Sequence, residues 1–226
     1  MSLNSRIWSG DSTAVAEARA NYKEDREKGL IPYASTLYSF RNNKKFALVL
    51  FGFQSELRRR AEREMSVEAS GLTDEERAGL ADVLTTIFEW MIRRFTHDEF
   101  ESSGFRENWQ QFPFLITQLS EWGMKHAIKT NAYHSFCLLK CTQARLYFER
   151  DEAEIAEAAV NDAAIDSYCI KDPNQKVRVY AKVGFLYRIL GVRMEGYRFG
   201  FKALLVQGVP MNVRLKGLAL LLGFDR

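Results

Sequence analysis

Histidine and cysteine side chains at helical spacing offer the first candidate chemistry. His134, Cys137 and Cys141 fall at i, i+3 and i+7, on one face of an expected helix, and Cys169 adds a third thiol. Zinc prefers such ligands. Structural zinc sites usually place Cys pairs on tight turns, however, and small buried thiols on an apolar helix face explain the spacing equally well. We therefore predict no metal and no cofactor.

Acid–base and nucleotide chemistry have little support. The chain has three histidines, which leaves few candidates for general acid–base catalysis. Arg93, His97 and Asp98 bring a base near a cation at a helix end, but helical ribonucleases with an Arg/His pair space the two residues more widely. Neither G-x-x-x-x-G-K-[ST] nor G-x-G-x-x-G occurs. The chain is expected not to be an enzyme.

Cations and aromatic rings alternate near the C-terminus. Residues 176–202 hold seven Lys or Arg, six Phe or Tyr and one acid, Glu195. Lys and Arg neutralise phosphates, and rings stack on unpaired bases, which stabilises binding by about 1–3 kcal/mol per base. This combination predicts a protein that binds single-stranded nucleic acid, RNA more than DNA, and that coats it as a nucleoprotein does.

Helical periodicity of about 100° per residue separates these side chains into faces. It assigns Val179, Val183 and Tyr187 to the core. It also assigns to the core the next helix's apolar stripe, Met194, Tyr197, Phe201 and Leu205. The cations and the remaining rings are then the candidate nucleic-acid-binding residues: Arg178, Lys182, Phe185, Arg188, Arg193, Arg198, Phe199, Lys202, Arg214 and Lys216, with a second cluster at Arg41, Lys44 and Lys45.

The charge map leaves two alternatives open. Residues 149–172 carry eight acidic and two basic side chains, whereas residues 173–226 carry ten basic and two acidic ones. The basic side chains could serve only structure and solubility, with the acidic helix 152–168 facing them. Alternatively, the surface binds an acidic protein partner, and the chain is a helical adaptor or scaffold. The acidic helix, and an N-terminal arm with Ile7 and Trp8, also offer routes to self-association.

The periodicity favours an all-α bundle of about eight helices, in one domain over residues 1–226 or in two lobes, 1–112 and 113–226. Helices are expected at 13–28, 43–65, 73–95, from Pro113 onward, and at 131–148, 152–168, 173–190, 193–206 and 211–222. Thr73 and Glu76 form a capping-box pattern, and Asp172-Pro173 is a typical helix start. Gly29, Gly191 and Gly208 are expected to end helices.

A repeat of fixed period is not evident in these patterns. The last helices loosely resemble a single tetratricopeptide repeat at Gly184, Tyr187, Ala203 and Pro210.

Composition limits the class of protein. Hydrophobic residues make up 46% and charged residues 27% of the 226 residues, as in ordinary globular proteins. The apolar runs 46–53 and 218–224 are shorter than the roughly 20 residues of a membrane helix. Three cysteines do not make a disulfide framework. We expect a protein of the reducing cytoplasm without membrane contact.

Overall fold

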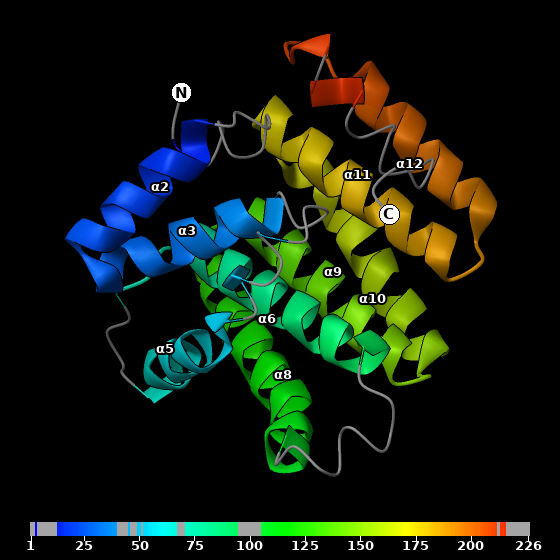
Figure 1. The fold of residues 1–226 in the computed structure, drawn as a ribbon. Helices are drawn as coiled ribbons and strands as arrows, with labels where there is room; N and C mark the ends of the chain where they lie inside the picture. The colour runs from blue at the N-terminus through cyan, green and yellow to red at the C-terminus, as the bar shows by residue number, and fades with distance from the viewer. Residues whose placement is uncertain are drawn as a thin grey trace. The chain divides into compact units, whose positions relative to one another are not determined.

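The computed structural model describes Leu3 and residues 13–39, 45, 49–50, 52–66, 71–94, 105–211 and 213–215 (Figure 1). Within these ranges there are nine helices of at least seven residues and no strand, which confirms the all-α prediction. The elements in chain order are α2 (Thr13–Glu24), α3 (Arg26–Ser39), α5 (Gln54–Ser66), α6 (Asp74–Arg94), α8 (Phe105–Lys129), α9 (Tyr133–Glu149), α10 (Ala153–Asp166), the short 3-10 helix η1 (Ser167–Cys169), α11 (Pro173–Ile189) and α12 (Arg193–Leu205). None of the described helices combines the length and apolarity that crossing a membrane requires.

The chain divides into two compact units, Met1–Leu119 and Ser120–Arg226. The expectation of one domain, or of two lobes that meet at residue 112, stays a prediction. Helix α8 has residues in both units. Pro113 lies inside α8 and does not start it, so the predicted helix start there is wrong. A proline in a helix interior removes one backbone hydrogen bond, and the turns on both sides can still be helical.

The first predicted helix is divided in two. Asp25 separates α2 from α3, and its Oδ1 accepts hydrogen bonds from the backbone N–H groups of Glu27 (3.0 Å) and Lys28 (3.1 Å). Asp25 is therefore an N-cap. The prediction that Gly29 ends a helix is wrong, because Gly29 is buried within α3. A Cβ at this position would lie 2.4 Å from Cα of Tyr22, so glycine allows the backbones of α2 and α3 to meet.

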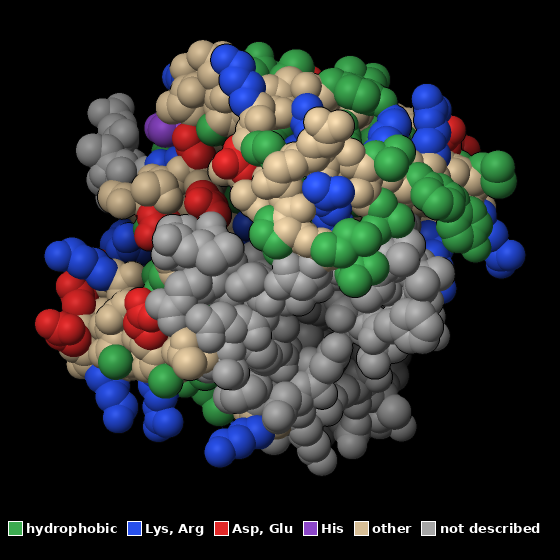
Figure 2. Space-filling model, turned by 90° about the horizontal axis from the view of Figure 1, so that it is seen from above, with side chains coloured by type: hydrophobic (Ala, Val, Ile, Leu, Met, Phe, Trp, Pro, Cys, Tyr) green, Lys and Arg blue, Asp and Glu red, His purple; other side chains and the backbone are tan. Residues whose placement is uncertain are grey.

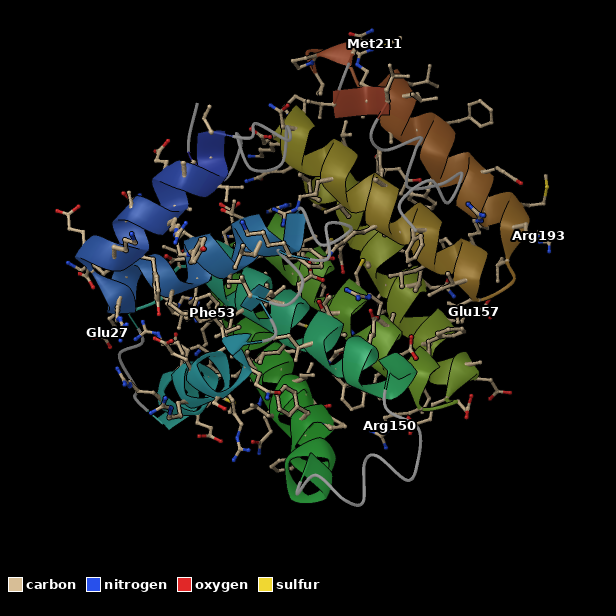
Figure 3. The ribbon with its side chains drawn as sticks, in the orientation of Figure 1. Glu27, Phe53, Arg150, Glu157, Arg193 and Met211 are labelled. Atoms are coloured by element: carbon tan, nitrogen blue, oxygen red, sulfur yellow. The ribbon has the colours of Figure 1, made fainter. Side chains whose placement is uncertain are left out.

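An aromatic cluster joins α2 and α3 to Phe53, the residue before α5, which is labelled in Figure 3. The ring centroids of Tyr22, Tyr33 and Phe53 lie 5.3–5.7 Å from one another. The Tyr22 hydroxyl also donates to Glu56 of α5 at 3.1 Å. The rings combine a large buried area with favourable edge and offset contacts, and they fix α5 against α2 and α3.

The start of α6 follows the capping-box prediction. The backbone N–H of Thr73 donates to Oε2 of Glu76 (2.9 Å), and the backbone N–H of Glu76 donates to Oγ1 of Thr73 (3.3 Å). Two N–H groups that the helix leaves without a carbonyl partner are thus satisfied reciprocally. The helix is described as far as Arg94, and its predicted end at residue 95 lies outside the described residues.

A buried ionic network lies beside this cap. Arg77 is 1% exposed. Its guanidinium donates to Glu64 of α5 (3.0 Å), to Asp74 (2.8 Å) and to the carbonyl oxygen of Leu72 (2.5 Å). Glu64 is buried as well. The network therefore joins α5, the connecting loop and α6 through one fully desolvated cation.

The second unit contains a structural repeat. Helices α9 and α10 pair through a short turn, as do α11 and α12, and each element of the second pair begins 40 residues after its counterpart (133 to 173, 153 to 193). Helix α11 also packs on α9 and on α10. The repeat is not evident in the sequence, because its two copies share few identical residues. Those that they do share include the Leu-Tyr pairs at 146–147 and 186–187.

The same turn leads into α9, α10 and α12. Asn131, Asp151 and Gly191 have positive φ angles of 56°, 61° and 84°. In each case the following residue donates its N–H to a carbonyl five residues back, at 2.8–2.9 Å. This is the Schellman arrangement, in which a left-handed residue closes the helix. The predicted helix end at Gly191 is confirmed, and Gly208 is also left-handed, with φ 78°. Asp172 caps α11 by accepting from Gln175 N–H at 2.8 Å, as predicted.

The buried network predicts a large cost for removing its cation. Arg77→Met leaves the Glu64 carboxylate buried without its partner, which should lower the free energy of unfolding by about 3–5 kcal/mol. The double variant Arg77→Met/Glu64→Leu should lose less, because the most deeply buried carboxylate, that of Glu64, is removed together with its partner. Urea denaturation followed by circular dichroism measures both. A loss for Arg77→Met no greater than that for the exposed control Arg59→Met would contradict the assignment.

Candidate interaction surface

Two glycines set the distance between α11 and α12. A Cβ at Gly196 of α12 would lie 3.0 Å from the carbonyl oxygen of Gly184 in α11 and 3.5 Å from Cβ of Arg188. Gly196, Phe199, Gly200 and Ala203 are the buried residues of α12. Their spacing of three and four residues forms a narrow stripe of mostly small side chains. Because these side chains are small, the two helix backbones approach closely.

This contact turns the large apolar side chains of α12 outward. Met194, Tyr197, Phe201 and Leu205 are 79%, 51%, 63% and 75% exposed. We call these four side chains the α12 stripe. The prediction that they form the core face of this helix is wrong. The same helix can bury either its large apolar residues or its small ones, and the close approach at Gly184 selects the small ones.

Phe199 is the ring that the helix buries. It is 3% exposed, and its centroid lies 5.6 Å from that of Tyr180 and 5.8 Å from that of Tyr187, both in α11. The predicted outward position of Phe199 for base stacking is therefore wrong. Val179, Val183 and Tyr187 are buried, which confirms their assignment to the core.

Exposed or half-buried cations lie on α12 and at the end of α11. Arg188, Arg193 and Arg198 are exposed, and Arg198 donates to Glu195 of the same helix at 3.3 Å. Lys202 is half-buried: its Nζ lies 4.2 Å from the Phe199 ring centroid and 4.8 Å from that of Tyr168, whose hydroxyl accepts a hydrogen bond from it. Figure 2 shows hydrophobic side chains among Lys and Arg side chains at the right of the view, on the side where Figure 1 draws α12.

The other candidate residues of α11 are partly buried. Arg178, Lys182 and Phe185 are half-buried. His134 of α9 is 6% exposed, and burial, together with the positive charges of Arg178 and Lys182, lowers its pKa to about 3. These two cations therefore lie near α9, and α11 does not present them as the open stripe that the periodicity predicted.

Of the other candidate residues, the structure describes Arg214 and Lys45. Arg214 donates to the carbonyl oxygens of Val209 (2.9 Å) and Leu204 (3.4 Å) and so holds the chain after α12. Lys45 is exposed in the first unit. Arg41, Lys44, Lys216 and the arm residues Ile7 and Trp8 lie outside the described residues.

Helix α10 presents an acidic outer face. Glu154, Glu157 and Asp162 are exposed, as are the apolar side chains Ile155 and Ile165. Asp162 pairs with Lys140 of α9 at 2.8 Å. On the α11 side, Asn161 accepts a hydrogen bond from the Tyr187 hydroxyl at 2.5 Å. Burial and the nearby carboxylates of Glu195 and Glu157 raise the pKa of Tyr187 to about 12.

The cysteine and histidine side chains are not assembled into a ligand set. Cys137 and Cys141 are buried and Cys169 is exposed. Burial is the main cause that raises the Cys137 pKa, which keeps this thiol protonated and inert. Within the described ranges, no group of three His, Cys, Asp or Glu side chains could hold a metal ion. His97 and Asp98 lie outside these ranges.

The sequence contains a signal for the face that α12 buries. Gly196 and Gly200 form a G-x-x-x-G pattern, followed three residues later by Ala203. This spacing places small residues on one helix face and marks close helix contacts. The first repeat has small buried residues at the equivalent contact, Ala144 and Ala156.

The close contact between α11 and α12 predicts that α12 tolerates substitutions on its exposed face but not larger side chains on its buried face. Gly196→Val places methyl groups against the Gly184 carbonyl, and overpacking of this kind should lower the free energy of unfolding by about 1–3 kcal/mol. The matched control Tyr197→Val introduces the same residue on the exposed face and should cost far less. Urea denaturation compares the two variants. Equal losses would place the contact elsewhere.

The low pKa of His134 predicts a specific acid sensitivity. The folded protein keeps this imidazole neutral down to about pH 3, whereas an unfolded histidine takes up a proton below about 6.5. The stability that comes from keeping His134 neutral is thus fully present above pH 6.5. It is lost as the pH falls, by up to about 1.4 kcal/mol of unfolding free energy per pH unit. Between pH 7 and 5, wild type should lose about 2 kcal/mol more than His134→Gln in urea unfolding. A His134→Gln variant that loses as much stability as wild type between pH 7 and 5 would contradict this assignment.

Comparison of the chain with protein-family models, with curated proteins and with solved structures gave no match.

Proposed function

We propose that this chain is a helical interaction module whose α12 stripe binds an acidic, amphipathic segment of a protein partner. The observation that carries the proposal is the exposure of the α12 stripe. Four large apolar side chains at i, i+3, i+7 and i+11 cover one face of a packed helix. A continuous exposed apolar face of this kind is typical of interaction sites.

The chemistry around the stripe favours a helical partner with carboxylates. An amphipathic helix presents apolar residues at the same spacing as α12 and can pack along the stripe. Arg193 and Arg198 lie on α12 itself and are exposed, where they attract a partner's acidic groups and orient it. Met194 and Leu205 are the most exposed side chains of the stripe. Their aliphatic surface suits a protein partner better than unpaired bases, which stack on rings.

Single-stranded RNA is the second candidate, and one observation favours it. The stripe contains two exposed rings, Tyr197 and Phe201, on the same helix as Arg193 and Arg198. Rings for stacking and cations for phosphates are the two parts of a single-strand site. Tyr197 and Phe201 are not among the stacking residues that the sequence predicted, whereas Arg193 and Arg198 are among the predicted cations.

One pair of variants tests the proposal. Tyr197→Ser/Phe201→Ser removes the apolar centre of the stripe and should weaken binding of a labelled acidic amphipathic peptide by roughly 30-fold, or about 2 kcal/mol. Ile128→Ser, which alters an equally exposed side chain on α8, is the matched control and should bind as wild type. Fluorescence anisotropy gives the affinities. Wild type that does not bind the peptide, or a serine variant that binds it unchanged, would refute the proposal.

A second pair of variants separates the two candidates. Tyr197→Leu/Phe201→Leu keeps the apolar area but removes both rings. Peptide binding should then persist, whereas stacking on a labelled single-stranded RNA should be lost. If RNA is the ligand, its binding should also fall with salt, with a slope of about 0.7 per phosphate contacted. RNA binding that is strong, salt-dependent and abolished by the leucine variant would favour the second candidate over the first.

A further inference from the structure

We infer that the acidic partner segment is α10 of a second copy of this chain, so that α12 of each copy packs on α10 of the other in a symmetric dimer. The inference rests on the proposed function, because it names an occupant for the same α12 stripe. We choose α10 as the occupant because its outer face is acidic, whereas the outer face of α12 is apolar and basic.

The 40-residue repeat makes α10 and α12 equivalent helices, so their outer positions can be compared one by one. The positions of Met194, Tyr197 and Phe201 in α12 correspond to Glu154, Glu157 and Asn161 in α10. Lys202 corresponds to Asp162. The same outward face is thus apolar and basic in the second copy of the repeat and acidic in the first.

Helix α10 has the composition that the α12 stripe requires of a partner. It contains four acids and no Lys or Arg. Ile155, Ala158 and Ile165 are exposed at i, i+3 and i+10, and they form an apolar line between carboxylates. Exposed Glu154 and Glu157 stand beside this line. In the dimer, the apolar line of α10 packs on the α12 stripe of the other copy. The carboxylates of α10 then meet the guanidinium groups of α12 at the edges of this contact, as in a typical interface between two helices.

The two faces are neighbours in one unit. Tyr187 of α11 lies between them: its hydroxyl donates to Asn161 of α10, and the carboxylates of both Glu157 (α10) and Glu195 (α12) raise its pKa. At the other end, Lys202 of α12 contacts Tyr168, which follows α10. Figure 3 draws Glu157 and Arg193 toward the same end of this unit.

Neighbouring complementary faces favour a two-fold dimer. A two-fold axis that places α12 on α10 of the second copy also places α10 on α12, so both contacts form at once. Stable interfaces bury about 800 Å² on each partner, and one pair of helix faces alone supplies little of this area. Forming two contacts together makes the dimer more stable than a single head-to-tail contact.

A charge exchange tests the pairing. Variant A carries Arg193→Glu and Arg198→Glu on α12, and variant B carries Glu154→Lys and Glu157→Lys on α10. All four positions are exposed. Sedimentation velocity should show wild-type dimers, with the dimer Kd raised at least 10-fold in A and in B, since like charges then meet in both contacts. An equimolar mixture of A and B should recover the dimer, because both contacts of the mixed pair again join opposite charges.

Controls exclude effects of folding and of net charge. Lys125→Glu/Lys171→Glu makes the same charge change as variant A at exposed positions outside both faces and should dimerise as wild type. Circular dichroism checks that A and B are folded. If either is not, the neutral pairs Arg193→Gln/Arg198→Gln and Glu154→Gln/Glu157→Gln replace them, and each should weaken the dimer.

The outcomes separate this inference from the proposed function. Wild type that remains monomeric at every concentration, or a mixture of A and B that does not recover the dimer, overturns the inference. The proposed function then stands or falls on the acidic peptide alone. Conversely, a dimer that is insensitive to A and B shows that another surface joins the copies, and this too overturns the inference.

Discussion

The contact between α11 and α12 at Gly184 and Gly196 is the constraint on which the second unit depends. A helix can pack with any of its faces, and the backbone of the helix against which it packs determines which face is buried. Here a carbonyl oxygen stands 3.0 Å from where a Cβ would be, so only a face of small residues fits. Phe199, the one large side chain on that face, inserts between Tyr180 and Tyr187. The four large apolar residues of the α12 stripe have no room inside and remain at the surface.

The turns that precede α9, α10 and α12 give the unit its regular form. A left-handed residue at 131, 151 or 191 reverses the chain within three residues, and two backbone hydrogen bonds close each turn. Only glycine adopts this conformation without strain, while Asn and Asp tolerate it. Repetition of one turn places α10 and α12 in equivalent positions, and these positions are where the two copies of the repeat differ most in charge.

The two units are stabilised by different means. In the first unit, Arg77 is surrounded by carboxylates and a carbonyl group, and Gly29 allows two helices to touch. In the second unit, aromatic rings and small residues form the contact between α11 and α12. His134 of the same unit is buried and neutral near two cations. The surface proposed for binding lies on α12, which packs closely on α11 through Gly184 and Gly196.

Local signals determined much of this protein from the sequence alone. The helical class, the capping box at Thr73, the Asp172 cap and the end at Gly191 follow from interactions within a few residues, so the sequence displays them directly. The rotation of α12 depends on the carbonyl of Gly184 in another helix, and the break at Asp25 competes with a periodicity that continues through it. Exposure is likewise a property of packing: the pattern that identified Met194, Tyr197, Phe201 and Leu205 as one face was correct, but only the tertiary structure decided that this face points to solvent.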